Sequence, residues 1–155
     1  MRGGLWFIYT FSVLLAIVLP KSQRLRRSRD FSKVYRLGNK AVSTHLVVRV
    51  LDTVNPGSQP TSQTEGLSSQ NHAENRAVLG RVGIVVSQKV SKRAVVRNRL
   101  KRQVRAIMGQ FLPRLRPHLW IVVNLRPGAE QCEYGDFLQE LKQLFTQLEV
   151  FHGHS

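Results

Sequence analysis

The sequence predicts a single domain built from both helices and strands. Three runs rich in β-branched and apolar residues indicate strands, at 42–52, 79–90 and 118–128, the last ending in Pro127 and Gly128. Two other stretches, 92–115 and 134–148, repeat apolar residues at the spacing of one helical face. A chain of 155 residues suits one domain of ordinary size, and 42% hydrophobic residues allow it a buried core.

Shorter features connect these elements. Residues 21–40 carry apolar side chains at spacings compatible with a short helix, which Gly38 ends. Ser91 is the expected cap of the long helix that follows the second strand, and Pro113 helps to close that helix. Residues 52–78 are rich in Ser, Gln, Asn, Pro and Gly, so they predict a mobile surface loop with too few apolar groups to order itself.

The first 18 residues differ from the rest of the chain. An apolar run from Leu5 to Leu19 has the length of a signal-peptide core and is marginal for a membrane span. No small-x-small cleavage pattern follows it, and residues 21–27 are strongly basic instead. Because GTG can serve as a bacterial initiation codon, the sequence favours translation from near Val18, with 1–18 as an upstream extension or an apolar leader. We therefore expect one domain over 19–150, an insertion at 52–78 and a short tail at 151–155.

Charge is the strongest clue to partners. The chain has 24 Lys and Arg against 9 Asp and Glu, a formal net charge of +15. Such an excess repels itself unless a polyanion neutralises it, so nucleic acid is the first partner to expect. Most acids cluster around the last helix, whereas none lies between Gly80 and Gln110.

The residue types that catalysis or metal binding would need are scattered. A single cysteine, Cys132, excludes an internal disulfide and fits a reducing compartment. The histidines stand at none of the spacings of a zinc site. The carboxylates of Asp30, Asp52, Glu65 and Glu74 are far apart in sequence, whereas a two-metal nuclease needs clustered carboxylates. We expect no catalytic residue and no protein-bound metal.

Residues 92–111 form a two-faced helix when they are placed at 100° per residue. One arc holds Val96, Leu100, Val104, Ile107 and Phe111. The opposite side holds Arg97, Asn98, Arg99, Lys101, Arg102 and Arg105. Like charges one turn apart destabilise a helix by roughly a few tenths of a kcal/mol per pair, so this row favours a phosphate-binding surface over a solvated face. Asn98 can donate and accept, which suits a base edge or a 2′-hydroxyl. Taken alone, such a helix also suits DNA, a membrane surface or calmodulin.

Three stretches resemble one family. "VGIVVSQKVSKRAVVRNRLKRQVR" is similar to the signature of the bacterial ribonuclease P protein family, a strand ending in V-S-x-K followed by an R-N-R-x-K-R-x-x-R helix. "LPKSQRLRRSRDFSKVYRLG" resembles that family's N-terminal helix with its D-F-x-x-V-[FY] motif, and "IVVNLRPGA" resembles the strand and R-P turn after the basic helix. Together they span most of residues 19–148 in the family's order.

The resemblance implies both a fold and a function. The fold would be an α+β two-layer sandwich of the ribosomal protein S5 domain 2 type. It would have a mostly antiparallel four-stranded sheet, three helices and a left-handed βαβ crossover that carries the basic helix. The function would be that of the protein subunit of ribonuclease P, in which a catalytic RNA removes the 5′ leader of precursor tRNA by magnesium-dependent hydrolysis. The protein would bind that RNA and the leader in the cytoplasm, without stable membrane association, and the RNA would hold most of the Mg²⁺.

The resemblance also implies site residues. Those for RNA binding are Lys89, Lys92, Arg93, Arg97, Asn98, Arg99, Lys101, Arg102 and Arg105. Those for a leader-binding cleft are Phe31, Tyr35, Arg49 and Ser87, since aromatic rings stack on bases of any identity. For Phe31, plain core packing is an equally open alternative.

The chain departs from the family at several places. Relatives often carry an aromatic residue where Arg49 stands and a lysine where Gln88 stands, and both 52–78 and 1–18 are additions. Two other classes of protein stay open at this point. A ribosomal or RNA-chaperone protein would share the charge, and a membrane-anchored or secreted cationic protein would retain residues 1–19.

Overall fold

The computed structural model describes residues 19–54 and 80–151, so the 1–18 extension and nearly all of the expected loop at 52–78 lie outside the described residues. The elements, in chain order, are η1 (Lys21–Gln23), α2 (Ser28–Leu37), β1 (Asn39–Val42), β2 (Leu46–Asp52), β3 (Arg81–Val85), α3 (Ala94–Phe111), η2 (Leu112–Arg114), β4 (Leu119–Leu125), η3 (Ala129–Gln131) and α4 (Tyr134–Gln147). Among these residues, no helix is long and apolar enough to cross a bilayer.

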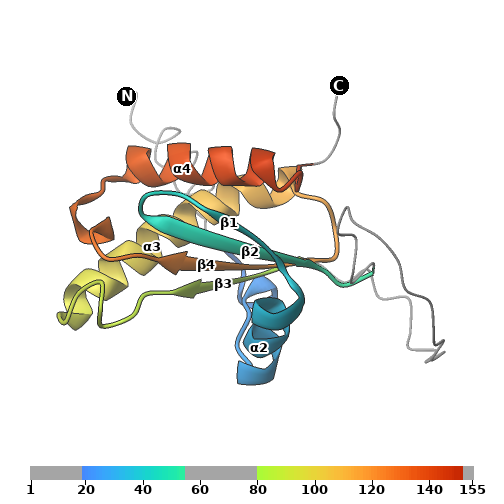
Figure 1. The fold of residues 1–155 in the computed structure, drawn as a ribbon, viewed down its shortest axis with the longest axis horizontal. Helices are drawn as coiled ribbons and strands as arrows, with labels where there is room; N and C mark the ends of the chain where they lie inside the picture. The colour runs from blue at the N-terminus through green and yellow to red at the C-terminus, as the bar shows by residue number, and fades with distance from the viewer. Residues whose placement is uncertain (1–18, 55–79, 152–155) are drawn as a thin grey trace, which may run out of the picture.

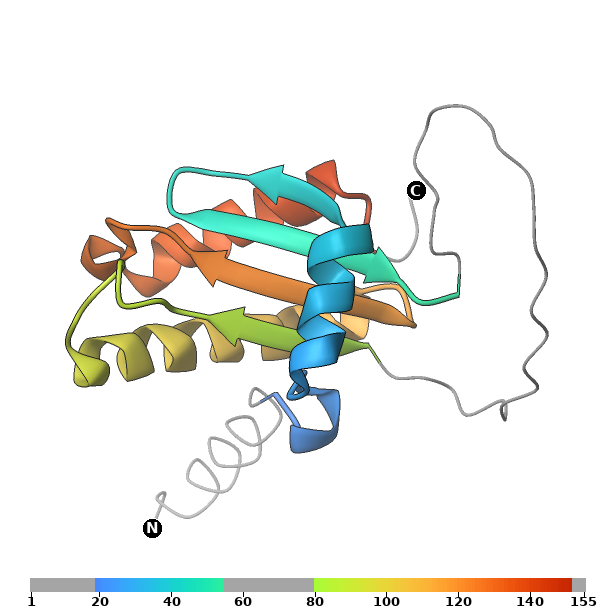
Figure 2. The same ribbon diagram turned by 60° about the horizontal axis from the view of Figure 1, so that its bottom comes forward.

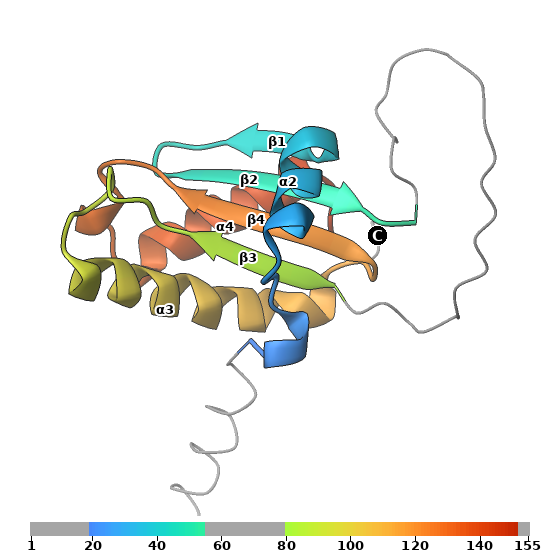
Figure 3. The same cartoon turned by 90° about the horizontal axis from the view of Figure 1, so that it is seen from below.

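The four strands form one mixed sheet in the order β1-β2-β4-β3. β1 and β2 pair antiparallel, as do β2 and β4, whereas β3 and β4 are parallel and are joined through α3. Seen from the α2 side, with α3 behind the sheet, the path from β3 through α3 to β4 is left-handed (Figure 3). The α+β sandwich implied by the family resemblance is therefore confirmed.

The helices divide unequally between the two faces of the sheet. α3 and α4 lie side by side over one face, and α2 crosses the other (Figure 1). Figure 2 shows α2 running across the strands, with the chain entering it beside β3 and leaving it beside β1. Among the described residues, α2 is therefore the one helix on that face of the sheet.

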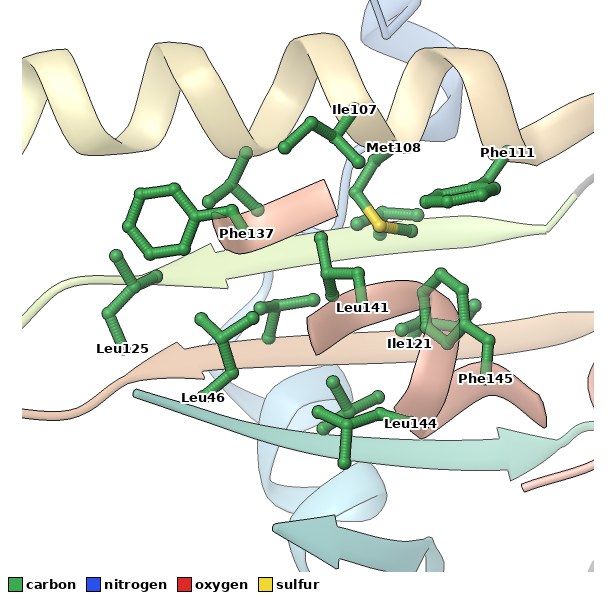
Figure 4. Packing of buried hydrophobic residues seen from close by; sticks show 14 of the residues in the cluster. Leu46, Ile107, Met108, Phe111, Ile121, Leu125, Phe137, Leu141, Leu144 and Phe145 are labelled. Atoms are coloured by element: carbon green, nitrogen blue, oxygen red, sulfur yellow. The ribbon is translucent and has the colours of Figure 1, made fainter. Parts of the chain in front are cut away.

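The main core lies between the sheet and the α3–α4 layer. Alternate residues of β2 and β4, such as Leu46 and Ile121, point into it (Figure 4). Helix residues close it from the other side, and Phe111 meets Phe145 edge to face with ring centroids 5.6 Å apart. Phe151 joins the same aromatic group at 5.8 Å from Phe111, so ordered packing extends to the last described residue.

A smaller core lies under α2. Leu25, Val34, Leu51 and Val122 are buried there. Gly38 is the C-cap of α2. Glycine fits this position because a Cβ here would lie 2.5 Å from the carbonyl oxygen of Val34. The glycine lets the chain turn directly from the helix into β1.

Some expected boundaries were wrong. The predicted strand at 42–52 is two strands, because residues 43–45 form the turn between β1 and β2. The long helix starts at Ala94 rather than Lys92, and its N-cap is Arg93 in an extended conformation. Ser91 lies two residues before this N-cap, and its Oγ accepts a hydrogen bond from the Arg93 N–H at 3.3 Å.

Candidate nucleic-acid interface

α3 separates its anchoring residues from its charged residues, as the periodicity predicted. Leu100, Val104 and Ile107 are fully buried against the main core, and Val96 is half-buried beside them. On the other side Asn98, Arg99 and Arg102 are exposed, and Arg97, Lys101 and Arg105 are half-buried. The helix thus holds a row of cations on a fixed support.

Arg97 fastens the start of α3 to the loop that precedes it. Its Nη1 donates to the carbonyl oxygens of Ser91 and Lys92, both at 2.8 Å. The loop therefore has a defined path, and its exposed cations, Lys89, Lys92 and Arg93, lie next to the helix N-terminus. These predicted RNA-binding residues and the R-N-R motif belong to one surface.

Arg99 makes a second fastening. Its Nη2 donates to the carbonyl oxygen of Glu130 at 3.0 Å, in the η3 turn that follows β4. Gly128 begins this turn with a φ of 97°, a conformation that favours glycine. The R-P turn singled out in the sequence thus packs beside the basic helix.

The cations of α3 have no acidic partner in the part of the chain that the structure describes. Within 19–54 and 80–151, none of them has a carboxylate oxygen within 4.0 Å of its nitrogens. Burial lowers the pKa of the Arg105 guanidinium, and the nearby positive charge of Arg24 lowers it further. An anion placed on this surface would relieve that repulsion.

Under α2, two of the predicted cleft residues meet. The Arg49 guanidinium lies over the Tyr35 ring, 5.4 Å from its centroid, and its Nη1 donates to the Tyr35 carbonyl oxygen at 3.1 Å. The Tyr35 hydroxyl in turn donates to Asn124 Oδ1 at 2.5 Å. Asn124 was missed in the sequence, although a lone amide in the apolar strand "IVVNL" was a usable signal.

Phe31, one helical turn before Tyr35, and Ser87 make other contacts. Phe31 is half-buried and packs with the smaller core, its ring against the backbone of Gly83, where a Cβ would lie only 2.4 Å from the ring. Ser87 is exposed on the β3–α3 loop, the loop that also carries Lys89. Of the predicted cleft residues, Tyr35 and Arg49 therefore contact each other and share Asn124 as a neighbour, whereas Phe31 lines a hollow with Arg24 and Arg105.

Glu140 and His45 form a contact that joins α4 to the turn between β1 and β2. Glu140 of α4 accepts hydrogen bonds from the Ser43 hydroxyl and from the His45 backbone N–H at 3.1 Å, and it pairs with His45 Nδ1 at 2.6 Å. Burial alone would raise the pKa of Glu140, but these contacts outweigh it and lower the pKa. In the part of the chain that the structure describes, no three His, Cys, Asp or Glu residues could hold a metal ion together.

A family model named Ribonuclease P matches residues 19–149. The chain belongs to the ribonuclease P protein family. A relative from Cyanothece sp. (strain PCC 7425 / ATCC 29141), named ribonuclease P protein component, is 44% identical over 137 residues, covering 88% of this chain and 100% of the relative. Another, from Synechocystis sp., is 40% identical over 138 residues, covering 88% and 94%.

Solved structures of ribonuclease P proteins share the fold. The protein from Staphylococcus aureus superposes with a TM-score of 0.64 at 21% identity, covering 85% of this chain and 100% of that one. The protein from Thermotoga maritima gives a TM-score of 0.57 at 24% identity, covering 84% and 98%.

Membership of this family sets the coarse function. The chain is a ribonuclease P protein component, a subunit of an endoribonuclease that processes tRNA and works as a ribonucleoprotein with an RNA partner. Family membership therefore favours a ribonuclease P protein over a ribosomal or RNA-chaperone protein.

Proposed function

We propose that the chain assists a catalytic RNA in the endonucleolytic removal of the 5′ leader from precursor tRNA, and that the RNA carries out the hydrolysis. The observation that carries this proposal is the cationic side of α3, which is held on a buried apolar stripe and has no carboxylate partner among the described residues. Such a surface binds phosphates, and nothing in it suits bond cleavage by the protein itself.

The catalytic RNA would lie along α3 and the loop before it. Arginine forks grip phosphate oxygens bidentately, and the lysines contribute point charges. Asn98, exposed among them, can bond a 2′-hydroxyl. The contacts would come from Lys89, Lys92, Arg93, Arg97, Asn98, Arg99, Lys101, Arg102 and Arg105.

The leader would lie in the cleft under α2. Tyr35 is 38% exposed, so a face or edge of its ring is open to a base even though Arg49 and Asn124 fix its position. Stacking on aromatic and guanidinium groups tolerates any base, which suits leaders of varied sequence. Phe31 is half-buried and would contribute the part of its ring that does not face Gly83, and Ser87 would contact the leader farther along, at the β3–α3 loop.

Mg²⁺ would be held mainly by RNA phosphates, because the described residues do not offer a cluster that fits the ion. The chain would instead reduce repulsion between the catalytic RNA and its substrate. We place this activity in the cytoplasm, without stable membrane association.

The test adds the purified protein to its catalytic RNA at low magnesium and measures cleavage of precursor tRNA. Wild-type protein should stimulate cleavage, and the double variant Arg97→Ala, Arg99→Ala should lose most of that stimulation. The matched control is Arg114→Ala, Arg116→Ala, which removes the same charge from exposed positions beyond the end of α3. Unchanged stimulation by the first variant would contradict the assignment of the R-N-R side.

The double variant also removes two internal fastenings, so thermal unfolding of both variants must accompany the cleavage assay. Replacing the same two arginines with lysine keeps the charge and loses the fork. We expect the lysine variant to recover part of the stimulation, which a purely structural defect would not predict.

A further inference from the structure

The segment that leads into α2 lies along the free edge of β3. The Leu25 N–H donates to the Val82 carbonyl oxygen at 2.9 Å, and Arg24 forms a parallel bridge with the same strand residue. Leu19 is 1% exposed and accepts a hydrogen bond from Arg24 Nε at its carbonyl oxygen, 3.1 Å away. The segment is therefore fixed, and so is the start of the side chains that leave it.

Three arginines surround one hollow at this edge. Arg24 and Arg26 of the segment and Arg105 of α3 line a space of about 190 Å³, with Phe31 and Ile84 in its apolar wall. No carboxylate is among the described residues that line it. Burial lowers the pKa of the Arg105 guanidinium, and the positive charge of Arg24 at the same hollow lowers it further. An anion between them would turn this repulsion into attraction.

A second hollow continues the same surface. It has a volume of about 390 Å³, shares Arg24 and Arg26 with the first, and adds Lys21, Arg27 and Arg81. Of the described residues that line it, Asp30 is the one acid. The two hollows together bring six cations to the edge of β3, which we call the β3-edge surface: Lys21, Arg24, Arg26, Arg27, Arg81 and Arg105.

The β3-edge surface is continuous with the cationic side of α3. Arg97, Lys101 and Arg105 are spaced four residues apart, so they follow one another along a single side of the helix. Arg105 is the last of them and the first residue of the hollow. An RNA backbone that follows α3 from Arg97 to Arg105 would therefore reach Arg24 and Arg26 next.

We propose that the β3-edge surface binds the phosphodiester backbone of the catalytic RNA, which thereby continues from α3 around the edge of the sheet. This inference rests on the proposed function, because it assigns the RNA on α3 and the RNA at the edge to one molecule. Precursor tRNA is the less favoured source, since the proposed leader cleft centres on Tyr35 and Asn124 and Arg105 belongs to the helix assigned to the catalytic RNA.

The test compares two variants that each lose three positive charges at exposed positions. The edge variant is Lys21→Gln, Arg26→Gln, Arg27→Gln. The matched control is Arg114→Gln, Arg116→Gln, Lys142→Gln, on η2, the turn after it and α4. Neither variant changes Arg24, which donates a hydrogen bond to the Leu19 carbonyl oxygen, or Arg105, which belongs to the RNA-binding residues already proposed on α3. Binding of the catalytic RNA is measured over a series of salt concentrations.

We expect the edge variant to bind the catalytic RNA about tenfold or more weakly, with the slope of log Kd against log salt reduced by about two, because each lost phosphate contact removes roughly 0.7–0.9 from that slope. The control should keep the wild-type slope. Phosphorothioate footprinting should show a set of RNA phosphates that lose protection with the edge variant and keep it with Arg97→Ala, Arg99→Ala.

Two outcomes would overturn the inference. If the edge variant matches the control in affinity and salt slope, the β3-edge surface does not contact the catalytic RNA. The proposed function would still stand if Arg97→Ala, Arg99→Ala loses binding in the same assay. An edge variant that binds the catalytic RNA normally but loses affinity for precursor tRNA relative to mature tRNA would assign the surface to the leader instead.

Discussion

At the residue scale, Gly83 shows how closely α2 approaches the sheet. Its missing side chain makes room for Phe31, and a Cβ would lie 2.4 Å from the ring and 3.2 Å from the Leu25 Cβ. We expect Gly83→Ala to destabilise the fold by about 1–3 kcal/mol, because the ring must leave its place in the smaller core. Urea denaturation would measure this.

The matched control for that change is Gly135→Ala. Gly135 lies in the first turn of α4, and a Cβ there would meet nothing within 4 Å. Alanine should therefore stabilise the protein by about 0.4–1 kcal/mol through the unfolded state. Equal effects of the two substitutions would show that the contact between Phe31 and Gly83 does not constrain the fold.

Glu140 provides a pH-dependent contribution to stability. Its pKa is lowered from an ordinary 4.5, since the hydrogen bonds from Ser43 and His45 outweigh the effect of burial. The unfolded chain then binds more protons than the folded one, so this contribution is present above about pH 4.5 and is lost as the pH falls through the lowered pKa. Glu140→Gln should flatten the fall in unfolding free energy between neutral and acid pH.

The control for this effect is Glu130→Gln. Glu130 is exposed, and it contacts Arg99 through its backbone carbonyl oxygen, which the substitution keeps. Chemical denaturation of both variants and the wild type at several pH values would measure the difference. The role of the β1–β2 turn contact is contradicted if the two variants show the same pH profile.

At the scale of elements, α3 works because anchoring and binding use different sides. Leu100 is fully buried, whereas Val95 on the same helix is 75% exposed. Leu100→Ala should reduce the unfolding free energy by about 2–5 kcal/mol through the cavity that it leaves. Val95→Ala should change stability by less than about 0.5 kcal/mol.

The same pair tests whether rigidity matters for RNA binding. Below its unfolding temperature, Leu100→Ala should keep affinity for the catalytic RNA within about threefold of wild type if the cations need only a folded helix. A much larger loss of RNA affinity in a protein that is still folded would mean that binding depends on the exact position of α3 against the sheet.

Elements with a strong period could be predicted from the sequence, and elements defined by tertiary contacts could not. Helices α3 and α4 carry repeating apolar stripes, so their existence was clear from residues alone. β1 is four residues long with Asn39 and Lys40 at its start, and only pairing with β2 makes it a strand. The bridge between Arg24 and β3 is likewise a long-range contact that leaves no local pattern.

The candidate site divides in the same way. The cationic side of α3 followed from spacing and charge, because a helix puts residues three and four apart on one side. That Arg97 and Arg99 also hold carbonyl oxygens of neighbouring loops depends on where those loops fold, which spacing does not encode. Arg49 was placed by resemblance, and its stacking on Tyr35 depends on the packing of α2 against β2, which the sequence does not encode locally.

At the scale of the whole molecule, charge is distributed by element, since acidic α4 and cationic α3 lie side by side over the same face of the sheet. Most of the described acids lie on or beside α4 and the η3 turn, with Glu130, Glu133, Asp136 and Glu140 among them, whereas α3 and its preceding loop carry cations and the β3 edge has Asp30 as its one acid among six cations. The net charge of +15 is therefore directional, so the polyanion should be drawn to one side of the protein.

This distribution predicts a steep dependence of RNA binding on salt. Eight cations are proposed to face the catalytic RNA along α3 and its loop; if about half of them contact phosphates, log Kd should change with log salt with a slope of about three or more. Filter binding of the folded catalytic RNA from low to physiological salt would measure it, with thermal unfolding in the same buffers as the control. Because released counterions are the physical source of this slope, a nearly flat line would mean that the proposed contacts are not to phosphates. Affinity would then have to come from uncharged contacts such as that of Asn98, and Asn98→Ala would weaken binding more than Arg97→Ala, Arg99→Ala.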